Sequence, residues 1–300
     1  MKRILDIRPR EFSTYSKPDI LASIKAAEGR TLLSEVIAPA PALFHDVSNV
    51  ELAAAFGADM MLINMYDVNA PSIDAYAYQG DHLLKDVQNT VGRFVGINLE
   101  PVSEDPLMDE KRVISEGRKA SLTTVQKALD QGAQYVLLTG NPKTGVTNKE
   151  IVRAIKEIAA TLGEKIIIMA GKMHSSGIAS ETATEMLNQT HIKAFIDAGA
   201  DVILIPAPGT VPGFSESYAQ TLVDYIHSHG KLAMSAIGTS QEGADSDTIR
   251  LIALACKRIG VDIHHIGDAG FMGIATPENI LQYSKTIRGI RHTYRRMAMR

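Results

Sequence analysis

The sequence has little cysteine: Cys256 is its only one, so a disulfide within the chain is excluded. Cys256 lies in an apolar helical run over residues 249–259, which offers no loop or strand end from which a thiol could attack a substrate. A free cysteine in such a setting behaves as a small hydrophobic side chain. We therefore predict that Cys256 belongs to the core.

Long hydrophobic runs are also missing, and neither sign of charge dominates. No window approaches about 18 uninterrupted apolar residues, the length that a membrane span requires. Residues 1–10 carry charges where a secretory signal peptide would be apolar. The net charge of −3 and the pI near 6.3 give no indication of nucleic-acid binding. We expect a soluble, cytoplasmic protein.

One basic stretch, at the C-terminus, has an ordinary explanation. Cations stabilise the C-terminal end of a helix. We therefore expect a solvated helix end to carry its arginines, which are Arg288, Arg291, Arg295, Arg296 and Arg300.

Sequence motifs of several enzyme classes are absent. The chain has no H-x-H after its first predicted strand, no H-E-x-x-H, no G-x-S-x-G and no Walker G-x-x-x-x-G-K-[ST]. No predicted strand ends in D-x-D-x-[TV]. These absences argue against binuclear amidohydrolases, zinc proteases, nucleophile-elbow hydrolases, P-loop proteins and haloacid dehalogenase phosphatases.

The chain does contain a repeated junction between a helix and a buried strand. It occurs at residues 56–64, 131–139, 198–206 and 259–267. Each copy has a glycine just past a helix, where a positive φ costs little, then a small residue and an apolar run. Strands that are apolar at consecutive positions are buried on both faces, as in parallel sheets.

The intervals between these copies leave room for more strands, so that eight strands alternate with eight helices. The predicted strands are 31–37, 60–65, 94–99, 135–139, 165–170, 202–206, 231–236 and 261–266. A preceding helix over 17–27 is placed to plug the bottom of a barrel. We predict an α/β fold, a single (β/α)8 TIM barrel over residues 1–300, with 1–30 as an N-terminal helical extension. A doubly wound open sheet is the alternative.

Two glycine-bearing strand ends, A-I-G-T-S (236–240) and I-G-D-A-G (266–270), would lie next to each other in that barrel. Their backbone N–H groups suit a phosphate group, which such barrels commonly bind there. The predicted phosphate-binding residues are Gly238, Thr239, Gly267, Asp268 and Gly270. The alternative is that both sets only form tight turns into helices.

Polar side chains at the other strand ends are the candidates for chemistry, since active sites of such barrels lie there. Lys172 could form a Schiff base, bind an anionic substrate or lie in solvent. His174 could be an acid, a base or a loop cap. Glu35 and Glu100 complete the catalytic candidates. The predicted substrate-binding residues are Asn64, Asn98, Thr139, Asn141 and Ser235.

Three carboxylates could share a divalent metal. Glu35, Asp67 and Glu100 follow neighbouring strands, and carboxylate oxygens suit Mg²⁺ or Mn²⁺. Each could instead act as a general base or pair with a cation. His264 and His265 lie within the last strand, where alternation turns one imidazole inward and the other toward the helices. We interpret them as core residues rather than ligands.

Two family resemblances can be stated. Residues 135–156 (Y-V-L-L-T-G-N-P-K-T-G-V-T-N-K-E-I-V-R-A-I-K) resemble the BtpA-type barrel proteins, which have a similar T-G…T-G turn before a helix. Residues 192–206 (I-K-A-F-I-D-A-G-A-D-V-I-L-I-P), with G-K-M-H at 171–174, are similar to the phosphoenolpyruvate mutase and isocitrate lyase superfamily. Both resemblances imply a barrel. The cysteine of that superfamily's K-[KR]-C-G-H loop and its D-x-D are missing here.

The leading functional hypothesis is an enzyme acting on a small phosphorylated sugar or sugar acid, with isomerase, epimerase, aldolase and lyase chemistry open. One alternative is a metal-assisted hydrolase or lyase that uses Glu35, Asp67 and Glu100. Another is a regulatory barrel that binds a sugar phosphate without catalysis. We expect a phosphorylated metabolite and a second copy of the chain as partners, and neither nucleic acid nor membrane.

Overall fold

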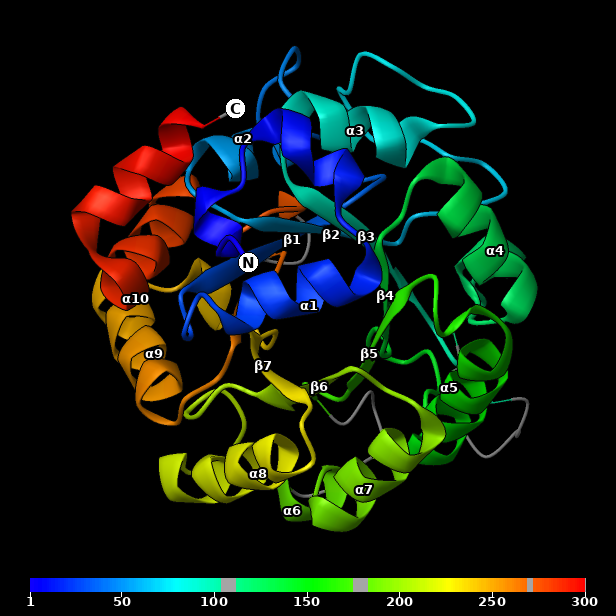
Figure 1. Ribbon diagram of the computed structural model, residues 1–300, viewed down its shortest axis with the longest axis vertical. Coiled ribbons are helices and arrows are strands. Elements are labelled where there is room, and N and C mark those ends of the chain that lie inside the picture. Colours follow the sequence, from blue (N-terminus) through cyan, green and yellow to red (C-terminus); the bar gives the residue numbers. More distant parts are fainter. Residues whose placement is uncertain (104–111, 175–182, 269–271, 300) are drawn as a thin grey trace.

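A closed barrel of parallel strands forms the centre of the computed structural model, which describes residues 1–103, 112–174, 183–268 and 272–299. Within these ranges the strands follow one another around the barrel in sequence order (Figure 1). They are β1 (Thr31–Ile37), β2 (Met60–Asn64), β3 (Phe94–Leu99), β4 (Tyr135–Leu138), β5 (Ile167–Gly171), β6 (Val202–Pro206), β7 (Leu232–Ile237) and β8 (Ile263–Ile266). Leu33 of β1 lies opposite His265 of β8, which closes the ring. The predicted (β/α)8 barrel is confirmed.

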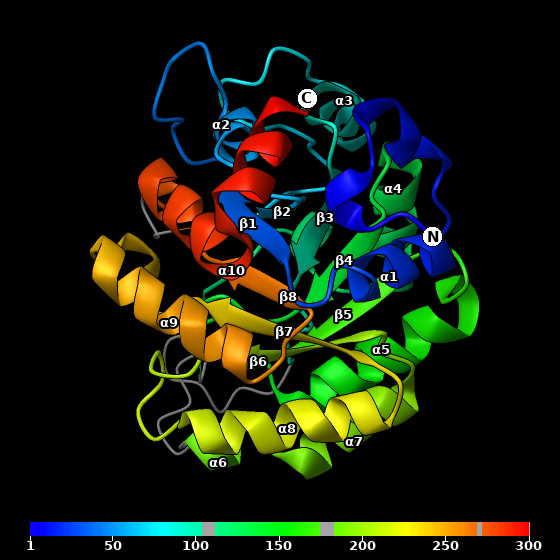
Figure 2. The ribbon, with the colours of Figure 1, turned by 60° about the vertical axis from the view of Figure 1, so that its left-hand side comes forward.

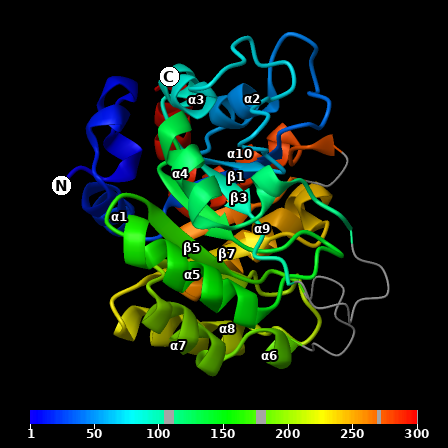
Figure 3. The same cartoon turned by 90° about the vertical axis from the view of Figure 1, so that its right-hand side faces the viewer.

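Helices surround the barrel, as Figures 2 and 3 show from two sides. They are α1 (Lys17–Lys25), α2 (Asn49–Ala55), α3 (Leu83–Val91), α4 (Leu122–Gln131), α5 (Asn148–Leu162), α6 (Ala183–Met186), α7 (Gln189–Ala198), α8 (Glu216–Ser228), α9 (Ser246–Arg258) and α10 (Pro277–Ala298). Short 3₁₀ helices are η1 (Ile4–Asp6), η2 (Pro9–Thr14), η3 (Glu116–Arg118) and η4 (Gln241–Gly243). In the described part of the chain no helix is both long and apolar enough to span a bilayer.

Local sequence explains where several helices begin and end. Ser48 caps α2 by accepting a hydrogen bond from Glu51 N, while the Glu51 carboxylate accepts one from Ser48 N at 3.1 Å. Gly132 and Gly199 end α4 and α7 in the left-handed conformation. Two described helices, α6 and α7, precede β6, because Asn188 caps a new helix start at α7. The described junctions therefore match the repeat that the sequence contains.

Alternate residues of each strand face opposite sides, and this sorts the buried side chains into two cores. The outer core lies between strands and helices and includes Leu32, Ile63 and Ile203. The inner core fills the barrel and includes Leu33 and Leu62. Parity along a strand therefore decides whether a polar side chain can reach the barrel interior.

The N-terminal segment closes the bottom of the barrel, at the amino ends of the strands. Ile4, Phe12, Ile20 and Ile24 are fully or almost fully buried and belong to the inner core. Figure 1 looks along the barrel and shows α1 lying across this end. The predicted plug helix is confirmed, and it leaves the opposite end as the open one.

The C-terminal arginines differ from the prediction of a solvated helix end. Arg288 and Arg296 are 7% and 1% exposed and both pair with the buried Asp59. Gly289 has a φ of 75°, which breaks the helical path inside α10. Its last turns therefore reach the bottom of the barrel, where Arg93 donates a hydrogen bond to Met299 O at 2.7 Å. The prediction was wrong for Arg288 and Arg296.

Candidate active site

A cavity of about 880 Å³, lined by both polar and apolar residues, opens at the carboxyl ends of the strands. Residues from seven of the eight strand ends line it, together with the segments that follow β1 and β3. Sequence-predicted residues that line it are Glu35, Asn64, Asn98, Thr139, Asn141, His174, Gly238, Gly267 and Asp268. The fold thus collects most of the predicted site residues in one place.

Asn64, at the end of β2, organises one side of this cavity. Its Nδ2 donates to Asn141 Oδ1 and to Asp268 Oδ2, both at 3.0 Å. Its Oδ1 accepts from Met65 N at 2.8 Å and from Asn98 and Asn141, both at 3.1 Å. Both amide hydrogens and the carbonyl oxygen are thus engaged by protein groups. Asn64 therefore lines the cavity with its amide already bonded to its neighbours.

Glu35 and His265 form a buried pair on the other side. Glu35 points inward from β1, and its Oε2 lies 2.7 Å from His265 Nε2 on β8. An ionised carboxylate only accepts hydrogen bonds, so Nε2 carries the proton in this pair. His265 Nδ1 is buried with no hydrogen-bond partner among the described residues. The expectation that one of the two histidines turns inward is confirmed.

His264, its neighbour in β8, faces the helices. Its Nε2 lies 3.1 Å from Gly29 O and its Nδ1 lies 3.3 Å from the Tyr283 hydroxyl. Burial lowers the pKa of His264 to about 3, so this imidazole stays neutral. The prediction of a satisfied core histidine is confirmed for His264.

Glu242 was not among the predicted site residues, yet it lines the cavity. It is 4% exposed and lies in η4, after β7. Burial raises the pKa of its carboxyl, and the negative charge of Glu35 acts in the same direction. Its Oε2 has no hydrogen-bond partner in the part of the chain that the structure describes. A buried carboxyl whose pKa is raised is suited to donate a proton.

His174 has its pKa shifted in the opposite sense. Burial lowers the pKa of His174, and the charge of Lys172 adds to this, whereas Glu35 and Glu100 oppose it. The imidazole is therefore mostly neutral at pH 7 and can accept a proton. Lys172 itself is 1% exposed and does not line the cavity. Its charge acts on the imidazole of His174, which lines the cavity.

The two glycine turns lie side by side. A Cβ added to Gly267 would come within 3.5 Å of Gly238 Cα and 2.6 Å of Ile237 O, so this close approach requires glycine. Gly267 N donates to Ile237 O at 2.8 Å and is therefore not a donor for phosphate. Thr239 turns its hydroxyl to Thr210 O at 2.9 Å, away from the cavity. Gly270 lies outside the described residues.

Glu100 is held by partners at the rim. Arg118 Nη2 donates to Glu100 Oε1 at 2.6 Å, and Asn141 N donates to Oε2 at 3.0 Å. Glu100 does not line the cavity, whereas Arg118 and Arg112 do. They bring two guanidinium groups to the β3 side of the mouth.

The predicted metal site is not formed by its three carboxylates. Asp67 accepts a hydrogen bond from Asn69 N at 2.8 Å and lies against Gly117, outside the cavity, and Glu100 pairs with Arg118. Considering the described ranges alone, no group of three His, Cys, Asp or Glu side chains could hold a metal ion. The grouping of Glu35, Asp67 and Glu100 is therefore corrected.

The prediction that Ser235 binds substrate is also corrected, because its side chain does not face the cavity. It lies between Met234 and Ala236, which both belong to the inner core, so its side chain points outward. Its hydroxyl is close to Cys256 and Tyr283 on the helical layer. Cys256 is fully buried there, as predicted. Alternation along the strand places Ser235 opposite to Met234 and Ala236, but only the closed barrel shows that those two face inward.

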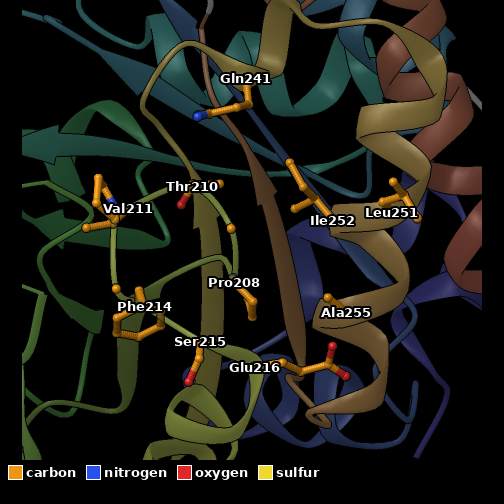
Figure 4. A pocket seen from close by; sticks show the side chains of 13 residues that line it. Pro208, Thr210, Val211, Phe214, Ser215, Glu216, Gln241, Leu251, Ile252 and Ala255 are labelled. Atoms are coloured by element: carbon orange, nitrogen blue, oxygen red, sulfur yellow. The ribbon is translucent and has the colours of Figure 1, made fainter.

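A second hollow, of about 700 Å³, lies between the loop after β6 and helix α9. Figure 4 shows the apolar side chains Val211, Phe214 and Ile252 around it, with Gln241 of η4 at its edge. The Thr239 hydroxyl oxygen also lies 2.5 Å from Gln241 Oε1, so the wall of this hollow touches the glycine turn of the main cavity.

The fold and this cavity define a class: a (β/α)8 barrel with a polar site at its carboxyl end. The model of one family, described as "Domain of unknown function (DUF7916)", matches residues 5–300, and the chain belongs to this family. No curated protein matches the chain. The comparisons do not confirm the BtpA-type or phosphoenolpyruvate mutase resemblance.

Solved structures show the same fold at low identity. An archaeal fructose-1,6-bisphosphate aldolase with its catalytic lysine bound to the carbinolamine intermediate has a TM-score of 0.53, 12% identity, and coverage of 88% of this chain and 96% of its own. Another archaeal fructose 1,6-bisphosphate aldolase has a TM-score of 0.52 and 13% identity, and the match covers 87% of this chain and 95% of that one. The YdjI aldolase from Escherichia coli K12 has a TM-score of 0.51 and 12% identity, and the match covers 91% of this chain and 96% of that one. At such identities the likeness shows the fold alone.

Proposed function

We propose that this protein is an enzyme that moves protons on a small phosphorylated sugar or sugar acid, as isomerases, epimerases and aldolase-type lyases do. The observation that carries the proposal is a pair of groups with oppositely shifted pKa values, His174 and Glu242, which line one cavity. Groups whose environments shift their pKa values in opposite directions are suited to act as base and acid in one reaction.

In this proposal His174 accepts the proton and Glu242 donates one. The neutral imidazole would take a proton from carbon next to a carbonyl group, and the Glu242 carboxyl would protonate the carbonyl oxygen as an enediol forms. The charge of Glu35 bears on both groups, and His265 holds that carboxylate in place. Glu35 raises the pKa of both groups, so it opposes the effect of burial on His174 and adds to the effect of burial on Glu242.

The lining of the cavity supports a substrate with an anion at each end, one bound by backbone N–H groups and the other by guanidinium groups. Gly238 and Ser240 line the β7 side, where the glycine turn would approach a phosphate. Arg112 and Arg118 line the β3 side, which is diametrically opposite in a ring of eight strands. A phosphorylated sugar acid would place its phosphate at the first and its carboxylate at the second.

Proton exchange tests this proposal even while the product is unidentified. The protein is incubated in D₂O with single phosphorylated sugars and sugar acids, and NMR follows replacement of the hydrogen next to the carbonyl by deuterium. We expect exchange with at least one compound. Glu242→Gln and His174→Gln should each slow it by about 10²–10⁴-fold.

Two variants at exposed positions of the bottom serve as controls. Glu164→Gln and His229→Gln make the same chemical changes away from the cavity and should exchange at the wild-type rate. The proposal fails if no compound exchanges, or if Glu242→Gln and His174→Gln match their controls. Exchange that disappears after exhaustive chelation and returns with Mg²⁺ would favour the metal-assisted alternative instead.

A further inference from the structure

We infer that Asn98 Oδ1 accepts a hydrogen bond from a substrate hydroxyl, and that Asn98 therefore selects hydroxylated over deoxy sugar phosphates. This inference rests on the proposed function and narrows its substrate class. Asn98 is the penultimate residue of β3, is 3% exposed and lines the cavity. Its Oδ1 is buried and has no hydrogen-bond partner in the described ranges. An acceptor in this position is complementary to a donor that a ligand brings.

The orientation of the Asn98 amide follows from its neighbours. Met65 N can only donate, so the Asn64 atom that it contacts at 2.8 Å is the oxygen, Oδ1. At the other end of the same amide, Nδ2 contacts the Asp268 carboxylate, which fits a donor. Asn98 must therefore present its own Nδ2 to Asn64 Oδ1, at 3.1 Å. A flipped Asn98 would place two carbonyl oxygens against each other, so Oδ1 is held as the unpartnered atom.

The surroundings indicate a hydroxyl rather than an ammonium group as the donor. Arg118 is held by Glu100, which lies two residues beyond Asn98, and Arg118 Nε also has no hydrogen-bond partner among the residues described. Thr139, at the end of the neighbouring strand β4, lines the same cavity. The cavity wall that presents the Asn98 acceptor thus also includes two residues that can donate, Arg118 and Thr139. A hydroxyl can donate to the first and accept from the others, which an ammonium group cannot do.

Binding of matched ligand pairs tests the inference. Calorimetry measures D-ribose 5-phosphate against its 2-deoxy analogue, and D-glucose 6-phosphate against its 2-deoxy and 3-deoxy analogues. For at least one pair the wild type should bind the hydroxylated member tenfold or more tightly, because a site built to bond a hydroxyl rejects an analogue that lacks it. Asn98→Leu should lower the affinity for that member to that for its deoxy analogue, and leave the deoxy analogue unchanged.

The control Asn69→Leu changes an exposed asparagine in the same way and should keep the preference. Should Asn98→Leu not fold, as judged by circular dichroism, Asn98→Ala removes the same oxygen without added bulk. Equal binding of every pair by the wild type, or a preference that survives loss of Asn98, overturns this inference alone. No binding of any sugar phosphate overturns it together with the proposed function.

Discussion

Two buried charged clusters, one at each end of the barrel, use similar side chains in different ways. At the bottom, Asp59 is fully buried between Arg288 and Arg296, and its Oδ2 also accepts a hydrogen bond from Leu32 N at 2.8 Å. At the mouth, Glu35 pairs with His265 while Glu242 lies nearby. The bottom cluster gives its carboxylate two cations, whereas the mouth cluster brings two carboxyl groups together.

The hydrogen bonds of the two clusters indicate that the bottom cluster stabilises the fold and that the mouth cluster serves the cavity. The guanidinium groups at the bottom also donate to backbone carbonyls, such as Arg288 to Gly57 O and Arg296 to Ile7 O at 3.2 Å, so they tie α10 to the N-terminal segment. The mouth keeps buried atoms without protein partners, Glu242 Oε2 and His265 Nδ1, among the described residues. At the bottom, Asp59 Oδ1 and Arg296 Nε form no hydrogen bond within the described ranges either, but they lie 2.9 Å apart as an ion pair. Charges that compensate each other within the protein stabilise a fold, whereas uncompensated polar atoms at a cavity are suited to a ligand.

Removal of the central carboxylate at the bottom should have the largest effect on stability. Asp59→Ala leaves two buried guanidinium groups unpaired and should cost about 3–5 kcal/mol in the free energy of unfolding. Urea denaturation followed by circular dichroism measures it. The control Asp197→Ala breaks the exposed pair with Lys193 and should cost less than about 1 kcal/mol. Equal losses for the two variants would contradict the assignment.

The matching change at the mouth should give the reverse result. Glu35→Gln removes one of the two neighbouring carboxylates, so the free energy of unfolding should change by less than about 1 kcal/mol or rise, as at many functional sites. Proton exchange in D₂O should fall by about 10²-fold or more. A large loss of stability with exchange intact would show that both clusters serve the fold.

His264, the histidine of β8 that faces the helices, allows a test of how burial of a neutral imidazole affects stability at different pH values. The folded pKa of His264 is lowered to about 3, below its unfolded value near 6.5, so the unfolded state binds more protons between these values. Stability is thus lost as the pH falls below 6.5. Between pH 7 and pH 5 the wild type should lose about 2 kcal/mol more than His264→Phe does. His229→Phe, at an exposed position, should keep the wild-type pH dependence.

The smallest effect on the free energy of unfolding is expected for a partly exposed pair, His227 and Asp262, at the bottom of the barrel. His227 Nε2 lies 2.8 Å from Asp262 Oδ2, and this hydrogen bond raises the pKa of His227 above its ordinary value. Its stabilisation is therefore present below the unfolded pKa and is lost as the pH rises through the folded one. We expect less than about 1 kcal/mol, since solvent screens the pair. His227→Gln should remove this dependence between pH 6 and pH 9, and an unchanged profile would show that the pair contributes nothing.

Much of the barrel could be predicted because its pattern is local. Runs of apolar residues after a helix-ending glycine identify buried parallel strands without any tertiary information. β1, β3 and β6 therefore have their predicted bounds, and the other strands differ by one or two residues at one end or at both ends. Strand ends then predict which residues gather at the mouth, as they did for Asn98 and His174.

Residues outside this pattern could not be found in the same way. Glu242 lies in a short 3₁₀ helix beyond β7, and nothing in its local sequence marks a buried carboxyl. Arg118 reaches the mouth from η3 because Glu100 holds it. Arg288 and Arg296 looked like solvated residues of a helix end, because their partner Asp59 is more than two hundred residues away in the chain.

The amino-acid sequence was sufficient to specify eight buried strands, their order and the end at which a site forms, since hydrophobic periodicity and glycine placement act over a few residues. Closure of the barrel determined which side chains face the cavity and which of them contact one another. It turned Ser235 outward and His265 inward, set Glu35 against His265 across the β1–β8 seam, and left Asn98 with an unpartnered oxygen. Burial and pairing of charged groups depend on distances between remote segments, and only the folded chain defines those distances.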